Sequence, residues 1–204
     1  MLKVDAVIVG DKSHFALESM VDTYHQERSL MGIGYFLIHL NGYKYGVLQS
    51  NATALANSFD NVVRRIQNRG KHLAPFAEQA DPNEVAQAFR DALYSGDSTS
   101  SHYFGLPESE FSDLFYTNNL IMAPDGDAAF DDSSYILQFD VGDKVRIIGF
   151  QCKETDAPSP ESIMDVWMEA DDFYAVLGQW ETQFFNEWKK HIKLCPDFSV
   201  SPSR

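Results

Sequence analysis

The clearest hydrophobic pattern in the chain is a pair of apolar-rich runs, at residues 134–140 and 145–152, on either side of a short polar break. Gly142 and Asp143 lie in this break. Glycine followed by another residue is typical of a type II′ hairpin turn, because glycine adopts positive φ without a Cβ clash. A turn there pairs Tyr135 with Phe150, Leu137 with Ile148, and Phe139 with Arg146 on one face, and leaves Ile136, Gln138, Asp140, Val145 and Ile147 on the other. Because the first face is almost wholly apolar, we expect a half-buried antiparallel hairpin at the centre of the sheet.

A second hairpin is predicted nearer the start of the chain. Asn41-Gly42 separates apolar runs at residues 33–40 and 43–48, and Asn-Gly between such runs is the strongest short signal for a tight hairpin. Further strands are expected at residues 3–9, 14–21, 118–123 and 162–168. Loops or turns are expected at 24–30, 97–112 and 124–127, where polar or turn-forming residues predominate.

Three helices are predicted from apolar residues spaced three and four positions apart. They cover residues 50–69, 82–95 and 171–192, and one extra helical turn is expected at 111–115. Asp81-Pro82 supplies the second helix with a capping residue and a proline in its first turn. Asp171 is expected to cap the third, whose broad apolar face consists of Phe173, Leu177, Trp180, Phe184, Trp188 and Ile192.

These elements predict an α+β protein with a single domain over residues 1–196, in which α-helices pack on an antiparallel β-sheet built from hairpins. A length of 204 residues with 44% hydrophobic content is sufficient for one sizeable core. Residues 197–204 are expected to form a flexible tail. Two cysteines, Cys152 and Cys195, the absence of a secretory leader, and the absence of an apolar run of ~20 residues indicate a cytoplasmic protein.

The charge of the chain is strongly negative and unevenly distributed. The formal net charge is -14, which disfavours nucleic acids and anionic membranes as partners and favours basic surfaces. Residues 97–172 contain 17 acidic and 3 basic residues, whereas residues 1–96 contain 10 and 9. Either these acids form a patch that attracts a basic partner, or they are spread over the fold as solubilising charge.

Motifs that carry chemistry are missing from the sequence. The six histidines are scattered, neither cysteine belongs to a CxxC pair, and GxSxG, Walker A and GxGxxG motifs do not occur. Asp125-Gly126-Asp127 and Asp131-Asp132 resemble fragments of a calcium loop but lack its central glycine and terminal glutamate. Arg64, Arg65, Arg69 and Lys71 are interpreted as the solvated side of an amphipathic helix. We therefore expect no catalytic residue, cofactor or metal ion.

Several stretches nevertheless form a recognisable series. They are GDKSHFA at residues 10–16, the Asn41-Gly42 hairpin with Tyr45-Gly46, LQFDVGDKVRIIGF at 137–150, DVW at 165–167, and FYAVL at 173–177 continuing to Trp180. This series resembles the bacterial immunity protein 42 family of polymorphic-toxin and contact-dependent growth inhibition systems. The resemblance extends from about residue 8 to residue 190 and covers scaffold positions.

The resemblance implies a non-catalytic cytoplasmic antitoxin that binds the C-terminal domain of one cognate toxin and blocks its active site or substrate path. Many such toxins are nucleases with basic substrate surfaces, which an acidic protein complements. We expect the contacts to come from exposed acids near turns, namely Asp125, Asp127, Asp131, Asp132 and Asp143. The resemblance leaves the toxin and the oligomeric state open.

Two alternatives remain at this point. One is a metal-dependent hydrolase that uses paired carboxylates such as Asp131 and Asp132. The other is a structural or oligomerisation module that associates through its aromatic side chains.

Overall fold

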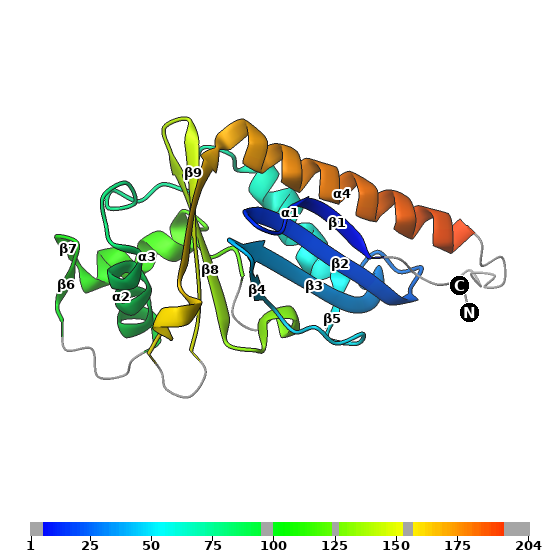
Figure 1. Cartoon of the computed structure of the whole chain (residues 1–204), viewed down its shortest axis with the longest axis horizontal. Coiled ribbons are helices and arrows are strands. Elements are labelled where there is room, and N and C mark those ends of the chain that lie inside the picture. The colour runs from blue at the N-terminus through cyan, green and yellow to red at the C-terminus, as the bar shows by residue number, and fades with distance from the viewer. Residues whose placement is uncertain (1–5, 95–99, 124–126, 153–156, 194–204) are drawn as a thin grey trace, which may run out of the picture.

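The computed structural model describes residues 6–94, 100–123, 127–152 and 157–193, and two antiparallel sheets set the architecture of this part (Figure 1). The larger sheet has the strand order β1-β2-β3-β4, and β5 pairs with β3. Its strands are β1 (Val7–Asp11), β2 (Phe15–Tyr24), β3 (Gly32–Leu40), β4 (Tyr43–Tyr45) and β5 (Thr53–Ala54). The predicted hairpin between β3 and β4 is confirmed. Asn41 and Gly42 both have positive φ, 48° and 81°, as a type I′ turn requires.

The smaller sheet contains the hairpin predicted at the centre of the fold. Its order is β10-β9-β8, with β8 (Ser134–Val141), β9 (Lys144–Gln151) and β10 (Met164–Glu169). Tyr135 pairs with Phe150, Leu137 with Ile148, and Phe139 with Arg146. The predicted register is therefore confirmed, and Gly142 has the positive φ, 61°, that its turn needs.

The α-helices cover both sheets. They are α1 (Leu55–Gln67), α2 (Pro82–Tyr94), α3 (Glu108–Thr117) and α4 (Ala170–Lys193). Between them lie the short strands β6 (His102–Tyr103) and β7 (Leu106–Pro107) and the 3₁₀ turns η1 (Ala128–Phe130) and η2 (Pro160–Ser162). In Figure 1, α1 and α4 lie along the larger sheet, and α2 and α3 lie on the far side of the smaller one. The described part confirms a mixed α+β single domain.

The β8–β9 hairpin divides the apolar interior into two cores. On one side, Ile136 and Ile147 pack with the larger sheet, α1 and α4. On the other side, Leu137 and Phe150 pack with α2 and α3. The expectation of a half-buried hairpin is therefore wrong, because helices or strands cover both of its faces.

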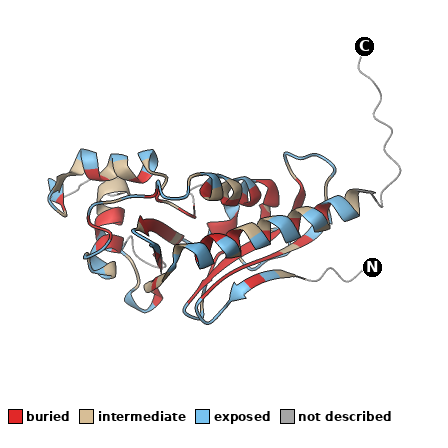
Figure 2. Ribbon diagram, turned by 90° about the horizontal axis from the view of Figure 1, so that it is seen from above, coloured by how far each residue is buried: buried red, intermediate tan, exposed pale blue. Residues whose placement is uncertain are grey.

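The last helix closes the first of these cores. Exposed and buried residues alternate along α4 (Figure 2), as expected for a helix with one face on a sheet. Phe173, Leu177, Trp180, Phe184 and Trp188 are all buried, which confirms the predicted apolar face. Asp171 lies inside the first turn of α4 rather than capping it.

The first helix begins later than predicted. Thr53 and Ala54 pair with β3, so their backbone stays extended and α1 starts at Leu55. The second helix follows the prediction, since Asp81 Oδ1 accepts a hydrogen bond of 2.9 Å from the amide of Asn83.

Two later predictions are also wrong in part. The loop expected at 97–112 includes β6, β7 and the start of α3, which is longer than the single turn expected. The strand expected at 118–123 makes only one isolated bridge, between Ile121 and Leu137. Asn119 has a φ of 50°, and this left-handed conformation interrupts an extended strand. The predicted tail, 197–204, lies outside the described residues.

Candidate functional site

A groove forms where three separate parts of the chain meet. These are the turn between β8 and β9, the residues that follow α1, and the first turn of α4, which lies beside the β8–β9 turn in Figure 1. The amide of Ala170 donates to the carbonyl of Asp143 at 2.8 Å and joins the first turn of α4 to the β8–β9 turn. The cavity has a volume of about 290 Å³ and is lined by Arg69, Gly70, Asp140, Gly142, Asp143, Lys144, Glu169, Ala170, Asp171 and Tyr174.

The inner wall of the groove includes Asp140, which is only 7% exposed. Its Oδ1 accepts hydrogen bonds from the hydroxyl of Tyr174 at 2.9 Å and from Nε2 of Gln138 at 3.3 Å. Its Oδ2 accepts from the backbone amide of His72 at 3.1 Å. No cationic side chain of the described ranges lies within 4.0 Å of this carboxylate. The charge is held by hydrogen bonds without a direct counter-ion.

Arg65 lies behind this carboxylate and is fully buried. Its guanidinium donates to Oε1 of Gln138 at 2.9 Å, to the carbonyl of Asn119 at 3.2 Å, and to the carbonyl of Ile121. Gln138 thus links Arg65 to Asp140. Burial lowers the pKa of Arg65 to about 9. The interpretation of Arg65 as a solvated residue is wrong, although Arg64 and Arg69 are exposed as expected.

His72 completes the buried polar group and is 0% exposed. Its Nδ1 lies 3.0 Å from the carbonyls of both Asn118 and Asn119, so Nδ1 carries the hydrogen. Its Nε2 is buried without a hydrogen-bond partner in the described part. Burial and, to a smaller extent, the charge of Arg65 lower the pKa of His72. The site therefore favours a neutral imidazole.

The rim of the groove is charged and exposed. Arg69 pairs with Asp171 at 2.5 Å, and Lys144 lies 3.9 Å from Glu169. Exposed pairs of this kind contribute about 0–1 kcal/mol to folding. Their carboxylates and cations therefore remain free to exchange partners when another surface approaches.

The structure separates the acids that were expected to form the contact surface. Asp143 lies on the groove, whereas Asp131 and Asp132 precede β8, at the other end of an eight-residue strand. At 3.3 Å per residue the two ends are about 25 Å apart. These acids do not form one patch. Asp125 lies outside the described residues.

Two of the predicted acids have structural partners. Asp127 is 7% exposed, and its Oδ1 accepts from the hydroxyl of Thr53 and from the amide of Ala129, each at 3.0 Å. The expectation that Asp127 is exposed is therefore wrong. Asp132 accepts from the amide of Gly46 at 3.1 Å and from Nε2 of Gln151 at 2.8 Å. Asp127 thus joins η1 to β5 of the larger sheet, and Asp132 joins the segment before β8 to Gly46 and to β9.

Comparison with known proteins places the chain in a family. Residues 7–183 match the family model described as Immunity protein 42. The chain belongs to this family. It is therefore an immunity protein by family, and the resemblance inferred from the sequence is confirmed. Among curated proteins, none matches the chain significantly.

A solved structure shares the fold of this immunity protein. It is the crystal structure of CdiI from Burkholderia dolosa AUO158, with a TM-score of 0.55 and 15% sequence identity. The match covers 87% of this chain and 99% of that chain. At this identity the comparison establishes a common fold.

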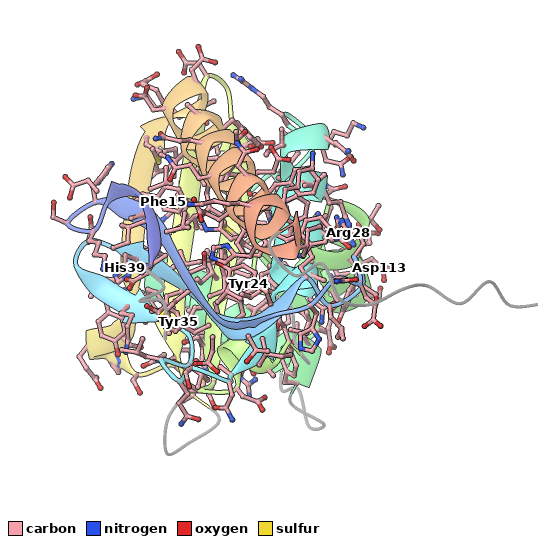
Figure 3. All side chains as sticks on the ribbon, turned by 90° about the vertical axis from the view of Figure 1, so that its right-hand side faces the viewer. Phe15, Tyr24, Arg28, Tyr35, His39 and Asp113 are labelled. Atoms are coloured by element: carbon pink, nitrogen blue, oxygen red, sulfur yellow. The ribbon has the colours of Figure 1, made fainter. Side chains whose placement is uncertain are left out.

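A second polar cluster lies on the larger sheet of the immunity protein. The carboxylate of Glu18 accepts from Nζ of Lys12 at 2.5 Å and from the hydroxyl of Tyr35 at 3.1 Å, and it lies 2.9 Å from Nε2 of His39. Tyr35 and His39, both labelled in Figure 3, are four residues apart in β3 and therefore share one face of the strand. Burial would raise the pKa of Glu18, but the bonds from Lys12 and His39 outweigh it and lower that pKa. These partners belong to the larger sheet and to the turn between β1 and β2, which indicates a structural role.

Neither cluster resembles a metal centre. Within the described ranges no three histidine, cysteine, aspartate or glutamate side chains are arranged to hold a metal ion. None of the described helices is long and apolar enough to cross a membrane.

The buried imidazole makes stability depend on pH. Because the pKa of His72 is lowered in the folded state from 6.5, the unfolded chain binds more protons at mildly acidic pH, and stability falls as pH drops below about 6.5. We expect urea unfolding to give a lower free energy at pH 5 than at pH 7.5, with a slope of at most about 1.4 kcal/mol per pH unit from this residue. His72→Gln should reduce the slope. Equal slopes in the two proteins would assign the effect to other groups, such as His39, whose pKa is also lowered by burial.

Proposed function

We propose that this immunity protein binds the C-terminal domain of one cognate toxin in the cytoplasm of the producing cell and blocks the toxin's active site or substrate path. The observation that carries the proposal is the family match over residues 7–183. The common fold with CdiI from Burkholderia dolosa supports it. Inhibition by binding needs a folded surface and no catalytic group. The buried carboxylates of Asp140 and Asp127 accept hydrogen bonds from groups within the fold, as structural side chains do.

The toxin is proposed to be a nuclease. The net charge of -14 supports this, because a nuclease presents a basic surface to its phosphate substrate. Carboxylates placed against that surface would take the positions of phosphates and repel nucleic acid. Of the acids expected to make the contact, we assign this role to Asp143, which is exposed on the groove, and keep Asp131 as a second exposed candidate.

The alternatives have no comparable support. The carboxylate of Asp132 is occupied by the amide of Gly46 and the side chain of Gln151, so the pair Asp131 and Asp132 is not poised for metal-dependent hydrolysis. The aromatic face of α4 is buried, and an oligomerisation module would need it exposed.

Co-expression with the toxin domain tests the proposal. An immunity gene is expected directly downstream of its toxin gene, so the C-terminal domain of the upstream gene product is the ligand to use. Cells that express this domain should survive only when they also contain the immunity protein, and the two proteins should co-purify. Purified toxin should cleave DNA or RNA, and one equivalent of the immunity protein should stop the cleavage.

Each outcome has a distinct meaning. Cells that die in spite of a folded immunity protein would overturn the antitoxin assignment. Protection against a toxin that leaves both DNA and RNA intact would keep the antitoxin assignment and overturn the nuclease assignment. A noncognate immunity protein of similar acidity is the control, because general charge effects would be the same for both.

A further inference from the structure

We infer that the groove between the β8–β9 turn and the start of α4 receives a basic side chain, arginine or lysine, from the bound toxin. This inference rests on the proposed function and names the surface and the chemistry through which it acts. The groove consists of the ten lining residues given above, and its inner wall includes the carboxylate of Asp140.

The size of the groove fits one side chain better than a separate ligand. Its volume of about 290 Å³ lies at the lower limit of the roughly 300–1,000 Å³ typical of small-molecule pockets. Such pockets are lined mainly by apolar and aromatic residues, whereas six of the ten lining residues here are charged. Volume and polarity together favour the end of a long, charged side chain.

The sign of the charge in the groove favours a cation. Four of the charged lining residues are acids and two are bases. Both bases already face acids, Arg69 opposite Asp171 and Lys144 opposite Glu169. Asp140 and Asp143 have no cation within 4.0 Å in the described part of the chain. Neither carboxylate therefore makes a direct ion pair, although Arg65 lies behind Asp140 and is linked to it through Gln138.

The start of α4 does not reverse this preference. A helix N-terminus alone attracts anions, because its amides carry a partial positive charge. Here Asp171 and Asp172 occupy the first turn, and the amide of Ala170 already donates to the backbone carbonyl of Asp143. The local field of the helix is thus opposed by two carboxylates.

Asp140 is prepared to accept one more hydrogen bond. A carboxylate offers about four acceptor positions, and the described donors, Tyr174, Gln138 and the amide of His72, use three. An ammonium or guanidinium group that enters the groove would make a charge-assisted bond, which is stronger than a bond between neutral groups. Because its neighbours already hold Asp140 in place, little side-chain entropy is lost on binding.

Two large apolar side chains are exposed on the segments that are linked to Asp140 through His72. Leu73 is 51% exposed and Tyr116 is 66% exposed. Nδ2 of Asn118 donates to the carbonyl of Leu73 at 2.6 Å and connects the two segments. Leu73 directly follows His72, whose amide binds Asp140. Tyrosine is enriched among the few positions that dominate binding at protein interfaces, so Tyr116 is the apolar contact to examine first.

A pair of charge-matched double variants tests the inference. Asp143→Lys with Glu169→Lys reverses two exposed acids of the groove, and Asp22→Lys with Glu27→Lys reverses two exposed acids elsewhere. The second pair flanks His25, whose carbonyl binds Trp188 near the other end of α4, about 25 Å along the helix from Ala170. Both variants change the net charge equally, so long-range attraction to the toxin falls equally.

The measurement is the dissociation rate from the immobilised toxin domain. The groove variant should dissociate about tenfold faster or more, and the control variant should match the wild type within about twofold. Equal dissociation of the two variants, with the wild type bound tightly, would overturn the groove and leave the antitoxin function intact. Failure of the wild type to bind any toxin domain would instead overturn the proposed function.

Asp140→Asn examines the inner wall directly. It should also accelerate dissociation, and its effect should disappear when the one toxin arginine or lysine that occupies the groove is replaced by alanine. A double-mutant cycle over the toxin's basic residues identifies that partner. If no basic residue is coupled to Asp140 or Asp143, the occupant is not a basic side chain. Urea unfolding of Asp140→Asn checks that this variant is folded. The double variant Asp143→Lys with Glu169→Lys changes only exposed residues, so it tests the groove without altering the interior of the protein.

Discussion

Replacing Arg65 with alanine is expected to lower the free energy of unfolding by about 3–5 kcal/mol. The side chain is fully buried, and its guanidinium donates to Gln138 and to the carbonyls of Asn119 and Ile121. The alanine variant leaves these acceptors without a donor and leaves a cavity the size of the lost side chain. An unsatisfied buried acceptor costs about 1–3 kcal/mol, and the cavity adds to this.

Arg64 provides a matched control for this prediction. It is the preceding residue of the same helix and is exposed, so Arg64→Ala should change stability by no more than about 0.5 kcal/mol. Urea unfolding monitored by tryptophan fluorescence gives both values. Arg65→Met keeps most of the volume and removes only the donors, so it should lie between wild type and Arg65→Ala. Similar small losses for Arg64→Ala and Arg65→Ala would contradict the buried role of Arg65.

The register of the central hairpin could be predicted because local physics determines it. Gly142 adopts positive φ, and every second residue of β8 and β9 then falls on the same face. The same holds for the Asn41-Gly42 turn and for the apolar face of α4. These features depend on neighbouring residues in the sequence, so composition and period are sufficient to find them.

The burial of Arg65 shows what the pattern of apolar and polar positions cannot predict, namely the hydrogen-bond partners of a buried charge. Its position follows Val62 by three residues and therefore falls on the buried side of α1. That spacing was a usable signal. The acceptors that make burial tolerable, at residues 119–121 and at Gln138, are remote in sequence and become neighbours only in the folded chain. Sequence alone therefore predicts a solvated arginine at this position.

The contacts of the candidate site could not be predicted for the same reason, because they join residues that are remote in the sequence. The half-buried hairpin predicted from the sequence leaves the face of Gln138 and Asp140 uncovered, yet Tyr174 of α4 and the amide of His72 satisfy Asp140 in the interior. The acids near turns could be recognised individually. Their separation, with Asp143 at one end of β8 and Asp131 at the other, depends on the path of the whole chain.

Replacing Trp180 with alanine is expected to lower the free energy of unfolding by about 3–5 kcal/mol. Trp180 is 0% exposed, and its ring lies 5.0 Å from that of Phe36 and 5.1 Å from that of Phe184. Its Nε1 also donates to the hydroxyl of Ser19 at 3.1 Å, so the substitution removes the hydrogen bond that joins α4 to β2. Trp180→Phe should lose less, because it keeps an aromatic ring in the core.

Trp167 is the control for this substitution and for its effect on binding. It is only partly buried, so Trp167→Ala should cost clearly less than Trp180→Ala. Trp180 lies ten residues beyond Ala170, about 15 Å along α4, and does not line the groove. At a temperature where Trp180→Ala remains folded, its dissociation from the toxin domain should therefore equal that of the wild type. A dissociation rate that rises with the loss of stability would mean that the whole α4 interface, rather than the charged groove at its start, determines how tightly the toxin is held.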